Sequence, residues 1–474
     1  MRLALPAKVS RRGGWDGRGK LSGGVFSLRK LTRVSGLTCR AWPQTVSAVK
    51  SSGKETTMEA ASADFRAVTP AAWAARIKAE LVDNILPFWP RYVMDREYGG
   101  FFGEVSEDLV VRKDSPRACV LNTRILWTYA AAAREISAEW RPVADWAFDY
   151  IRKHFWDPQH GGLFWTLDGK GAPLSARKQI YAQAFGIYAL SEYYRLTGEP
   201  AALELAKRLY LLIEQHGYDP KDGGYIEARG RAWEALADQR LSDKDLNSPK
   251  SMNTHLHVLE GYTNLLRVWP DEGLKAKQKA LLAVMMDHIV DAKAGHFKLF
   301  FDEQWHSLLD HISFGHDIEG SWLIWEAAEV LGDKALMARA KEIAIHMAHI
   351  AWEQGLDPDG SMLFEADGSG HIHDAKKHWW VQAEAVVGFY NAYQLTGDEA
   401  YRSAALHAWT FIEDNVADRV HGEWHAKLSR EGVVLTEAED SDAVLAGPWK
   451  CPYHNARVCY EMLNRLGRSE NKAP

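Results

Sequence analysis

A repeated glycine turn is the feature of this sequence that most restricts its fold. Six glycine-centred stretches, most of them followed by an aromatic residue, recur at intervals of about 62 to 72 residues. They are Tyr98-Gly99-Gly100-Phe101, His160-Gly161-Gly162-Leu163, Asp222-Gly223-Gly224-Tyr225, Ala294-Gly295-His296-Phe297, Asp359-Gly360-Ser361-Met362 and His421-Gly422-Glu423-Trp424. A regular period of this length is typical of a chain built from one repeated supersecondary unit.

A second repeated marker lies between these turns and indicates where helices end. It occurs as Leu196-Thr197-Gly198-Glu199, Val268-Trp269-Pro270-Asp271, Val330-Leu331-Gly332-Asp333 and Leu395-Thr396-Gly397-Asp398. A glycine or proline suits a helix C-terminus, and the acidic residue after it suits the start of the next helix. Apolar residues between the markers follow helical spacing, for example Leu256, Leu259 and Leu266. Each unit is therefore predicted to be two helices joined by a tight turn and followed by a short hairpin.

Six such helix pairs predict an all-α fold, with strands confined to hairpins. Repeats that cannot bury their apolar faces alone must stack on one another, and six of them can close into a ring. We therefore predict an (α/α)6 barrel, with six inner helices surrounded by six outer ones, as one domain over residues 58–474. An open solenoid is the alternative to a closed ring.

The first 57 residues differ in composition from the rest of the chain. They contain twelve Lys or Arg residues against two acidic ones, Asp16 and Glu55, and show no amphipathic period. A segment of this kind cannot bury a core and is predicted to be disordered. It is interpreted either as an Arg-rich transit peptide or, in preference, as sequence translated upstream of a true start at Met58.

Composition excludes several classes of protein. With 46% hydrophobic and 25% charged residues, the chain is an ordinary globular protein, and no apolar run is long enough to span a membrane. A net charge of -6 gives no reason to expect a nucleic acid or membrane partner. Four cysteines without CxxC spacing favour a reducing, cytoplasmic location. The 20 tryptophans suit a core and also suit the apolar faces of sugars.

Polar side chains recur at the start of each helix that ends at the second marker. They are Asn122 and Arg124, Tyr181 and Gln183, Asn253 and His257, His316 and Glu319, Trp380 and Glu384, and Trp449 and His454. Their spacing matches the repeat, so in a closed ring these side chains would lie together at one end of the barrel. Burial of an ionisable group costs free energy of folding. Because so many of these groups occupy the equivalent position in successive repeats, they indicate a functional site.

Other histidines do not share this phase and are interpreted as structural or surface residues. His371 and His373 lie in a loop rich in Gly and Asp, and His346 and His349 lie on an expected outer helix. Neither pair has a third ligand or an HExxH run, so no metal site is predicted. No motif for a nucleotide or another cofactor is present either.

Five stretches of this sequence resemble the N-acylglucosamine 2-epimerase superfamily, and within it most closely the cellobiose 2-epimerases. They are residues 121–128 (LNTRILWT), 251–257 (SMNTHLH), 315–319 (GHDIE), 379–385 (WWVQAEA) and 449–455 (WKCPYHN). The resemblance covers nearly all of residues 58–467, and residues 1–57 have no counterpart in it. It implies an (α/α)6 barrel that reversibly epimerises C2 of the reducing-end glucose in cellobiose, lactose or a similar β-1,4-linked disaccharide.

The resemblance also implies roles for individual residues. His316 and His454 are expected to be the acid/base pair at C2, His257 to act near O1 and O5, and Arg124 to hold the oxygens of the open-chain sugar. The expected binding or orienting residues are Asn122, Tyr181, Asp245, Asn253, Glu319, Trp379, Trp380, Glu384 and Trp449.

The chemistry of the residues agrees with these roles. Removal of a proton beside a carbonyl needs a base whose pKa lies near the working pH, and histidine has such a pKa. Inversion needs proton access to both faces of a planar intermediate, from two bases or by rotation of the intermediate. The enediolate intermediate carries a negative charge, and Arg124 and His257 are suited to stabilise it as a fixed positive group and a hydrogen-bond donor.

Four alternatives remain open at this point. One is a sugar-binding protein of this fold without catalytic activity, which would keep the tryptophans but does not need three histidines. An N-acylglucosamine 2-epimerase or a mannose isomerase would use the same histidines. A glycoside hydrolase with this fold would need two catalytic carboxylates, whereas the predicted site at the end of the barrel contains more histidines than paired acidic residues. The expected partner is a small sugar, a disaccharide, and the chain is expected to be a monomer or a homodimer.

Overall fold

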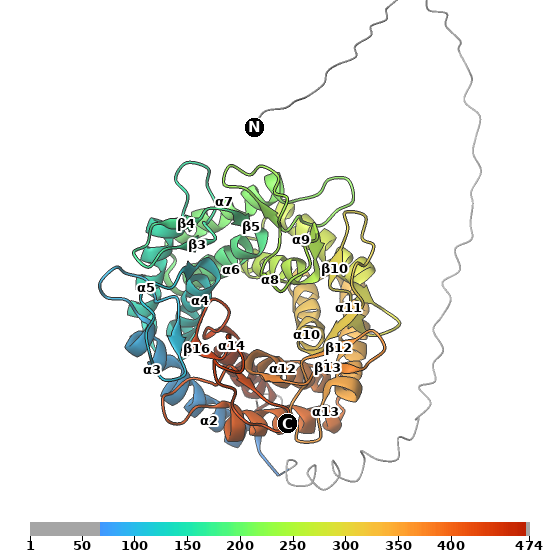
Figure 1. The fold of residues 1–474 in the computed structure, drawn as a ribbon. Helices are drawn as coiled ribbons and strands as arrows, with labels where there is room; N and C mark the ends of the chain where they lie inside the picture. Colours follow the sequence, from blue (N-terminus) through green and yellow to red (C-terminus); the bar gives the residue numbers. More distant parts are fainter. Residues whose placement is uncertain (1–66, 471–474) are drawn as a thin grey trace, which may run out of the picture. The chain divides into compact units, whose positions relative to one another are not determined.

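The structure is a computed structural model that describes residues 67–470 (Figure 1). The N-terminal segment 1–57 and the expected domain start at residue 58 lie outside the described residues. Within them, no helix is long and apolar enough to cross a membrane.

Six helices lie side by side around the axis of the fold and form its inner layer (Figure 1). They are α4 (Cys119–Glu135), α6 (Ile180–Thr197), α8 (Met252–Val268), α10 (Phe314–Leu331), α12 (Trp379–Thr396) and α14 (Tyr453–Glu470). Their residues are buried on nearly every side, because each inner helix contacts two inner neighbours and an outer helix.

The outer layer consists of helices, most of which continue into a π-helical turn. These are α2 (Pro70–Ala79) with η1 (Glu80–Ile85), α3 (Leu86–Phe88) and η2 (Trp89–Val93); η3 (Ala138–Trp140) with α5 (Arg141–Tyr150) and η4 (Ile151–Phe155); α7 (Pro200–His216); α9 (Glu272–Val284) with η5 (Met285–Ile289); α11 (Lys334–Ile350) with η6 (Ala351–Gly355); and α13 (Glu399–Phe411) with η7 (Ile412–Val416). Of these, η3 is a 3-10 turn, and α7 has no π-helical continuation.

The ring is closed by contacts between the two ends of the described chain. Helix α14 packs against both α4 and α2. Strand β1 (Val105–Ser106) pairs with β16 (Val444–Ala446), so Val105 lies opposite Ala446. The prediction of an (α/α)6 barrel is therefore confirmed, and the open solenoid is excluded.

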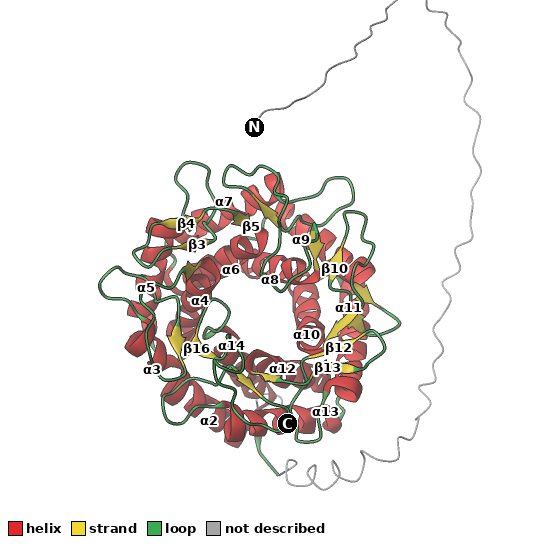
Figure 2. Ribbon diagram, viewed as in Figure 1, coloured by secondary structure: helices red, strands yellow, loops and turns green. Residues whose placement is uncertain are grey.

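Within residues 67–470, the strands form short antiparallel hairpins and ladders at one end of the barrel (Figure 2). The others are β2 (Arg117–Ala118), β3 (Thr166–Leu167), β4 (Pro173–Ser175), β5 (Lys178–Gln179), β6 (Ala228–Arg229), β7 (Lys250–Ser251), β8 (Val290–Asp291), β9 (His296–Phe297), β10 (Phe300–Phe301), β11 (His311–Ser313), β12 (Glu365–Asp367), β13 (Ile372–Asp374), β14 (Lys377–His378) and β15 (Lys427–Leu428). Their pairs are β2-β3-β4, β5-β6, β7-β10, β8-β9, β11-β12-β13 and β14-β15.

The second sequence marker does end helices as predicted. Gly198, Gly332 and Gly397 follow α6, α10 and α12 in the left-handed conformation, with φ of 68°, 68° and 76°. Glycine adopts this conformation without the steric cost that a Cβ atom would add. The side chain of Asp333 then caps α11 by accepting hydrogen bonds from Ala335 and Leu336.

A buried ion pair ties most glycine turns to the start of the next inner helix. Lys178 Nζ lies 3.1 Å from Asp157 with both side chains fully buried, and Lys250 Nζ lies 2.8 Å from Asp219. The equivalent pairs are Arg117 with Asp95, Lys377 with Asp357 and Asp359, and Lys450 with Glu423. In the fourth repeat Ile312 occupies the position of the basic residue. These pairs hold the N-terminal ends of the inner helices at one end of the ring.

Candidate active site

A cavity of about 690 Å³ opens where the inner helices begin. Eleven of the thirteen predicted site residues line it: Arg124, Tyr181, Asp245, Asn253, His257, His316, Glu319, Trp379, Trp380, Trp449 and His454. They come from every inner helix and from the loops before them. The repeat therefore brings its polar positions together, as a closed ring requires.

Two predicted residues do not line the cavity. Asn122 is buried, and its amide donates to the carbonyl of Ala118 at 2.9 Å, one turn earlier in the same helix. Glu384 lies behind the cavity wall and contacts His454 instead. A third residue in the polar series, Gln183, is structural, because it exchanges two hydrogen bonds with the backbone of Leu163 in the preceding hairpin.

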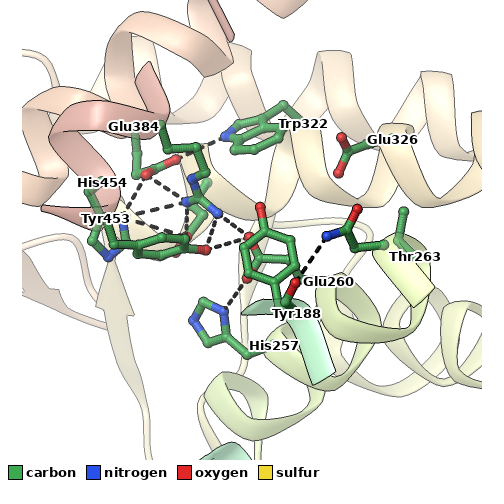
Figure 3. A network of polar contacts seen from close by, with 12 residues as sticks. Tyr188, His257, Glu260, Thr263, Trp322, Glu326, Glu384, Tyr453 and His454 are labelled. Carbon is green, nitrogen blue, oxygen red and sulfur yellow. Dashed lines mark hydrogen bonds and ion pairs between the residues drawn. The ribbon is translucent and has the colours of Figure 1, made fainter. Parts of the chain in front are cut away.

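His454 is held by a carboxylate on the neighbouring inner helix (Figure 3). Its Nδ1 lies 2.7 Å from Oε1 of Glu384, and the other oxygen of that carboxylate accepts a hydrogen bond from Trp322 at 3.0 Å. Burial, with the positive charges of Arg457 and Arg124, holds the pKa of His454 well below its usual range. The imidazole is therefore neutral near pH 7. A carboxylate accepts hydrogen bonds, so Nδ1 carries the proton and Nε2 is free to accept one.

His316 lies beside the same tryptophan as His454. The ring centres of His316 and His454 are 4.8 and 5.5 Å from that of Trp380. Nδ1 of His316 lies 2.8 Å from the hydroxyl of Ser313. Burial, and then the nearby His257, lower the pKa of His316 to about 3, so this imidazole is neutral as well. The cavity thus contains two neutral histidines from different repeats around one indole ring.

His257 is the third histidine of the cavity. Its Nδ1 lies 2.9 Å from Oε2 of Glu260, one turn later on α8 (Figure 3). The other oxygen of Glu260 accepts hydrogen bonds from Tyr453 and Arg457. Burial alone would raise the pKa of Glu260, but the interactions with Arg457 and His257 outweigh burial and lower this pKa to about 2. An ionised Glu260 fixes the His257 ring with its other nitrogen free.

Arg124 brings a buried positive charge to the cavity. Its guanidinium donates to the hydroxyl of Tyr181 at 2.8 Å and lies over the rings of Phe185 and Tyr453, at 4.2 and 4.7 Å. Among residues 67–470 it has no carboxylate within ion-pair distance. A buried cation without a counter-ion is suited to an anionic or strongly polar oxygen of a ligand.

Arg457 is the centre of the polar network behind the cavity. One of its nitrogens donates to Oε1 of both Glu319 and Glu384, at 2.5 and 2.7 Å. Burial and the charge of Glu384 raise the pKa of Glu319 to about 8, although Arg457 opposes the shift. Glu319, Glu384 and His454 are close enough together to hold a cation, but the guanidinium already donates to both carboxylates and would repel one.

The outer part of the cavity is aromatic and polar. Trp449 packs at an angle to Trp165 and Tyr181, with ring centres 6.2 and 6.0 Å apart. Asp245 lies on the loop between β6 and β7, where the backbone and hydroxyl of Ser242 donate to its carboxylate at 2.8 and 2.9 Å. The side-chain oxygen of Asn253 is buried with no hydrogen-bond partner within the described residues. Such an atom at a cavity wall is available to a ligand.

Sequence reasoning missed the residues that hold the histidines in place. Ser313, Glu260, Tyr453 and Arg457 were not among the predicted site residues. Helical spacing could have indicated two of them, since Arg457 and Glu260 follow His454 and His257 by three residues. Ser313 precedes its helix and has no such signal.

Comparison with known proteins places this chain among carbohydrate epimerases. The model of the N-acylglucosamine 2-epimerase (GlcNAc 2-epimerase) family matches residues 100–446. The chain belongs to this family. It is 46% identical to a cellobiose 2-epimerase of Bacteroides fragilis over 391 residues, which are 82% of this chain and 97% of the relative.

More distant members of the family are similar over a comparable length. The structure of a cellobiose 2-epimerase from Bacillus thermoamylovorans superimposes with a TM-score of 0.78 at 40% identity, covering 83% of this chain and all of that one. An N-acylglucosamine 2-epimerase of Bos taurus is 26% identical, over 83% of this chain and 92% of the relative.

Proposed function

We propose that this chain is a cellobiose 2-epimerase, which interconverts the two C2 epimers of the reducing-end sugar in β-1,4-linked disaccharides. Cellobiose would give glucosyl-mannose, and lactose would give epilactose. The observation that carries the proposal is the pair of neutral histidines, His316 and His454, that contact one indole ring at the cavity wall. The similarity to cellobiose 2-epimerases over most of the chain supports it.

The two histidines act on C2 of the open-chain sugar. One of them takes the C2 proton, the electron pair of that C–H bond forms a C1=C2 double bond, and O1 gains the negative charge. The first imidazole releases its proton to solvent, the other takes one up from solvent and gives it to C2 on the opposite face, and the C1 carbonyl forms again. Such positioned acids and bases contribute about 10²- to 10⁴-fold to a rate.

Arg124 and His257 stabilise the negative charge that develops on O1. The guanidinium of Arg124 is buried and has a free charge, and Glu260 fixes His257 with one nitrogen available. Fixed donors in a site from which water is excluded stabilise an oxyanion strongly. Protein groups therefore supply every step of the proposed reaction, and it needs no metal or other cofactor.

The outer part of the cavity binds the second sugar. Trp449 offers aromatic surface to it, and Asp245 and Asn253 offer hydrogen-bond acceptors to hydroxyl groups. Trp379 and Trp380 lie beside His454 and offer aromatic surface to the reacting sugar. A cavity of about 690 Å³ has room for two sugar rings. Glu319 lines the cavity as a binding residue, and Glu384 orients His454 rather than touching substrate.

One incubation tests the proposal and separates it from the alternatives. Purified protein is incubated in heavy water with cellobiose, lactose, mannose and N-acetylglucosamine, and the products are identified by NMR. We expect deuterium at C2 of glucosyl-mannose and epilactose. A ketose formed from mannose alone would indicate a mannose isomerase, conversion of N-acetylglucosamine alone would indicate an N-acylglucosamine epimerase, and glucose released from cellobiose would indicate a hydrolase.

A further inference from the structure

Ser313 stands at the N-terminal cap of α10 but does not cap the helix. A serine at this position normally accepts a hydrogen bond from a backbone N–H of the first helical turn. Ser251, at the same place before α8, does so, accepting from Thr254 at 3.1 Å. The Ser313 side chain makes no such bond and lies 2.8 Å from Nδ1 of His316 instead.

The burial of Ser313 indicates which of the two groups donates. Ser313 is 1% exposed, and within residues 67–470 its hydroxyl has Nδ1 of His316 as its hydrogen-bond partner. If the hydroxyl donates to Nδ1, its proton is satisfied. If it accepted from an Nδ1–H group, its own O–H would have no acceptor among residues 67–470 and would depend on water or substrate in the cavity that Ser313 lines. The neutral His316 ring therefore carries its proton on Nε2.

The proton of neutral His316 is thus on the opposite ring nitrogen from the proton of His454. The carboxylate of Glu384 lies 2.7 Å from Nδ1 of His454 and accepts a proton from it, so Nε2 of His454 has a free electron pair. The cavity thus holds one histidine whose Nε2 accepts and one whose Nε2 donates.

We propose that Ser313 is a positioning residue that determines which ring nitrogen of neutral His316 carries the proton, and that it also accommodates the protonated ring during turnover. The second part rests on the function proposed above. In neutral His316 the hydroxyl donates to Nδ1. When His316 takes up a second proton from solvent, that proton enters at Nδ1, Nδ1 becomes a donor, and the hydroxyl turns to accept from it; Nε2 can then give its own proton to C2. A hydroxyl serves both states, whereas a carboxylate would favour the protonated one.

Two titratable groups on other helices also act on His316. They are His257 on α8, which disfavours the protonated ring, and Glu384 on α12, which favours it. The remaining ring contact is with Trp380, which does not titrate. Ser313 is the side chain that hydrogen-bonds the His316 ring directly, and its removal leaves these other groups in place.

The protonation of the two rings can be measured directly in the whole chain. Nitrogen-15 NMR of histidine-labelled protein distinguishes a protonated ring nitrogen from one with a free electron pair, and a His316→Gln variant assigns the signals. Near pH 7 we expect the proton of His316 on Nε2 and that of His454 on Nδ1. A proton on Nδ1 of His316 would overturn the proposal. This measurement uses no substrate, so it stands even if the proposed reaction fails.

Kinetics test the role in turnover. Ser313→Ala is expected to lower kcat for cellobiose by about 10- to 100-fold, the range for a lost hydrogen bond to a charged group. Its pH profile should move to lower pH, because protonated His316 loses its acceptor. Ser313→Thr keeps the hydroxyl and should restore most of the rate.

Ser321→Ala is the matched control. Ser321 lies on the same helix, is fully buried and donates to the carbonyl of Ile318 at 2.7 Å, but it does not line the cavity. It should lower stability about as much as Ser313→Ala and leave the pH profile unchanged. A Ser313→Ala enzyme with normal kcat and pH profile, or a Ser313→Thr enzyme as slow as Ser313→Ala, would refute the proposal.

Discussion

Nδ1 of His454 lies 2.7 Å from the carboxylate of Glu384, although 70 residues separate them in the chain. The pair joins α12 to α14 behind the cavity wall and leaves the other nitrogen of the imidazole facing the cavity. Glu384 also accepts from Trp322 and Arg457, so three donors fix its position. This is the arrangement that a base for C2 needs: a ring held in one orientation and in one tautomer.

Replacement of Glu384 by Gln should therefore damage catalysis more than binding. The amide of Gln can donate to Nδ1 and thereby place the proton of His454 on the wrong nitrogen. We expect kcat for cellobiose to fall by at least about 100-fold with KM within a few fold, by analogy with other histidines whose orienting carboxylate is removed. Steady-state kinetics measure the effects on kcat and KM separately. Glu326→Gln, on the outer part of α10, is the control and should be normal; equal losses in both variants would contradict the role of Glu384.

The histidines themselves should be needed for turnover. His316→Ala and His454→Ala are each expected to lower kcat by about 10²- to 10⁴-fold. His255→Gln provides a matched control, because His255 is a buried histidine on α8 that accepts from the backbone of Tyr225 at 2.8 Å and does not line the cavity. Its turnover should remain near normal. Near-normal rates in both alanine variants would remove the acid/base assignment.

Glu319 should make the stability of the protein depend on pH. Burial and Glu384 raise its pKa to about 8 in the folded state, so the folded chain holds a proton that the unfolded chain releases above its ordinary pKa. Stability from this group is therefore lost as the pH rises toward 8. We expect Tm to fall between pH 5 and pH 8 by a few degrees more in the wild type than in Glu319→Gln, as thermal unfolding would show. An identical fall in both proteins would count against a protonated Glu319.

The buried ion pairs between turns and inner helices should stabilise the fold. Lys178 and Asp157 are both fully buried, and removal of Lys178 leaves the Asp157 carboxylate with the half-exposed Arg231, 3.0 Å away, as its remaining cation. Lys178→Met is expected to cost about 3 kcal/mol of unfolding free energy, measured by urea or thermal denaturation. Lys170→Met, at an exposed turn, is the control. Equal stability of the two variants would show that the pair contributes nothing.

The sequence contained enough information for the ring and for most of its cavity. The period of the glycine turns predicted six helix pairs, and the phase of residues such as His257 and His316 predicted which side chains meet. This worked because equivalent positions in a closed ring must point to the same end. Closure itself is visible only in the structure, where α14 packs against α4.

The same reasoning could not distinguish residues that line the cavity from residues that support it. Asn122 and Gln183 share the phase of Arg124, yet both hydrogen-bond to backbone, because a helix start also has structural bonds to satisfy. Ser313 was missed because its partner is set by a side-chain rotation that no sequence spacing reveals. The second ring of contacts around an active site depends on such details.

The exchange of the C2 hydrogen with solvent in the two single-histidine variants tests the central claim most directly. If His316 and His454 reach opposite faces of C2, each alanine variant keeps the base for one epimer only. In heavy water, one variant should exchange the C2 hydrogen of cellobiose without inversion, and the other should exchange that of glucosyl-mannose. Exchange of both epimers by one variant and of neither by the other would mean that a single histidine does all the proton transfer, which contradicts the account.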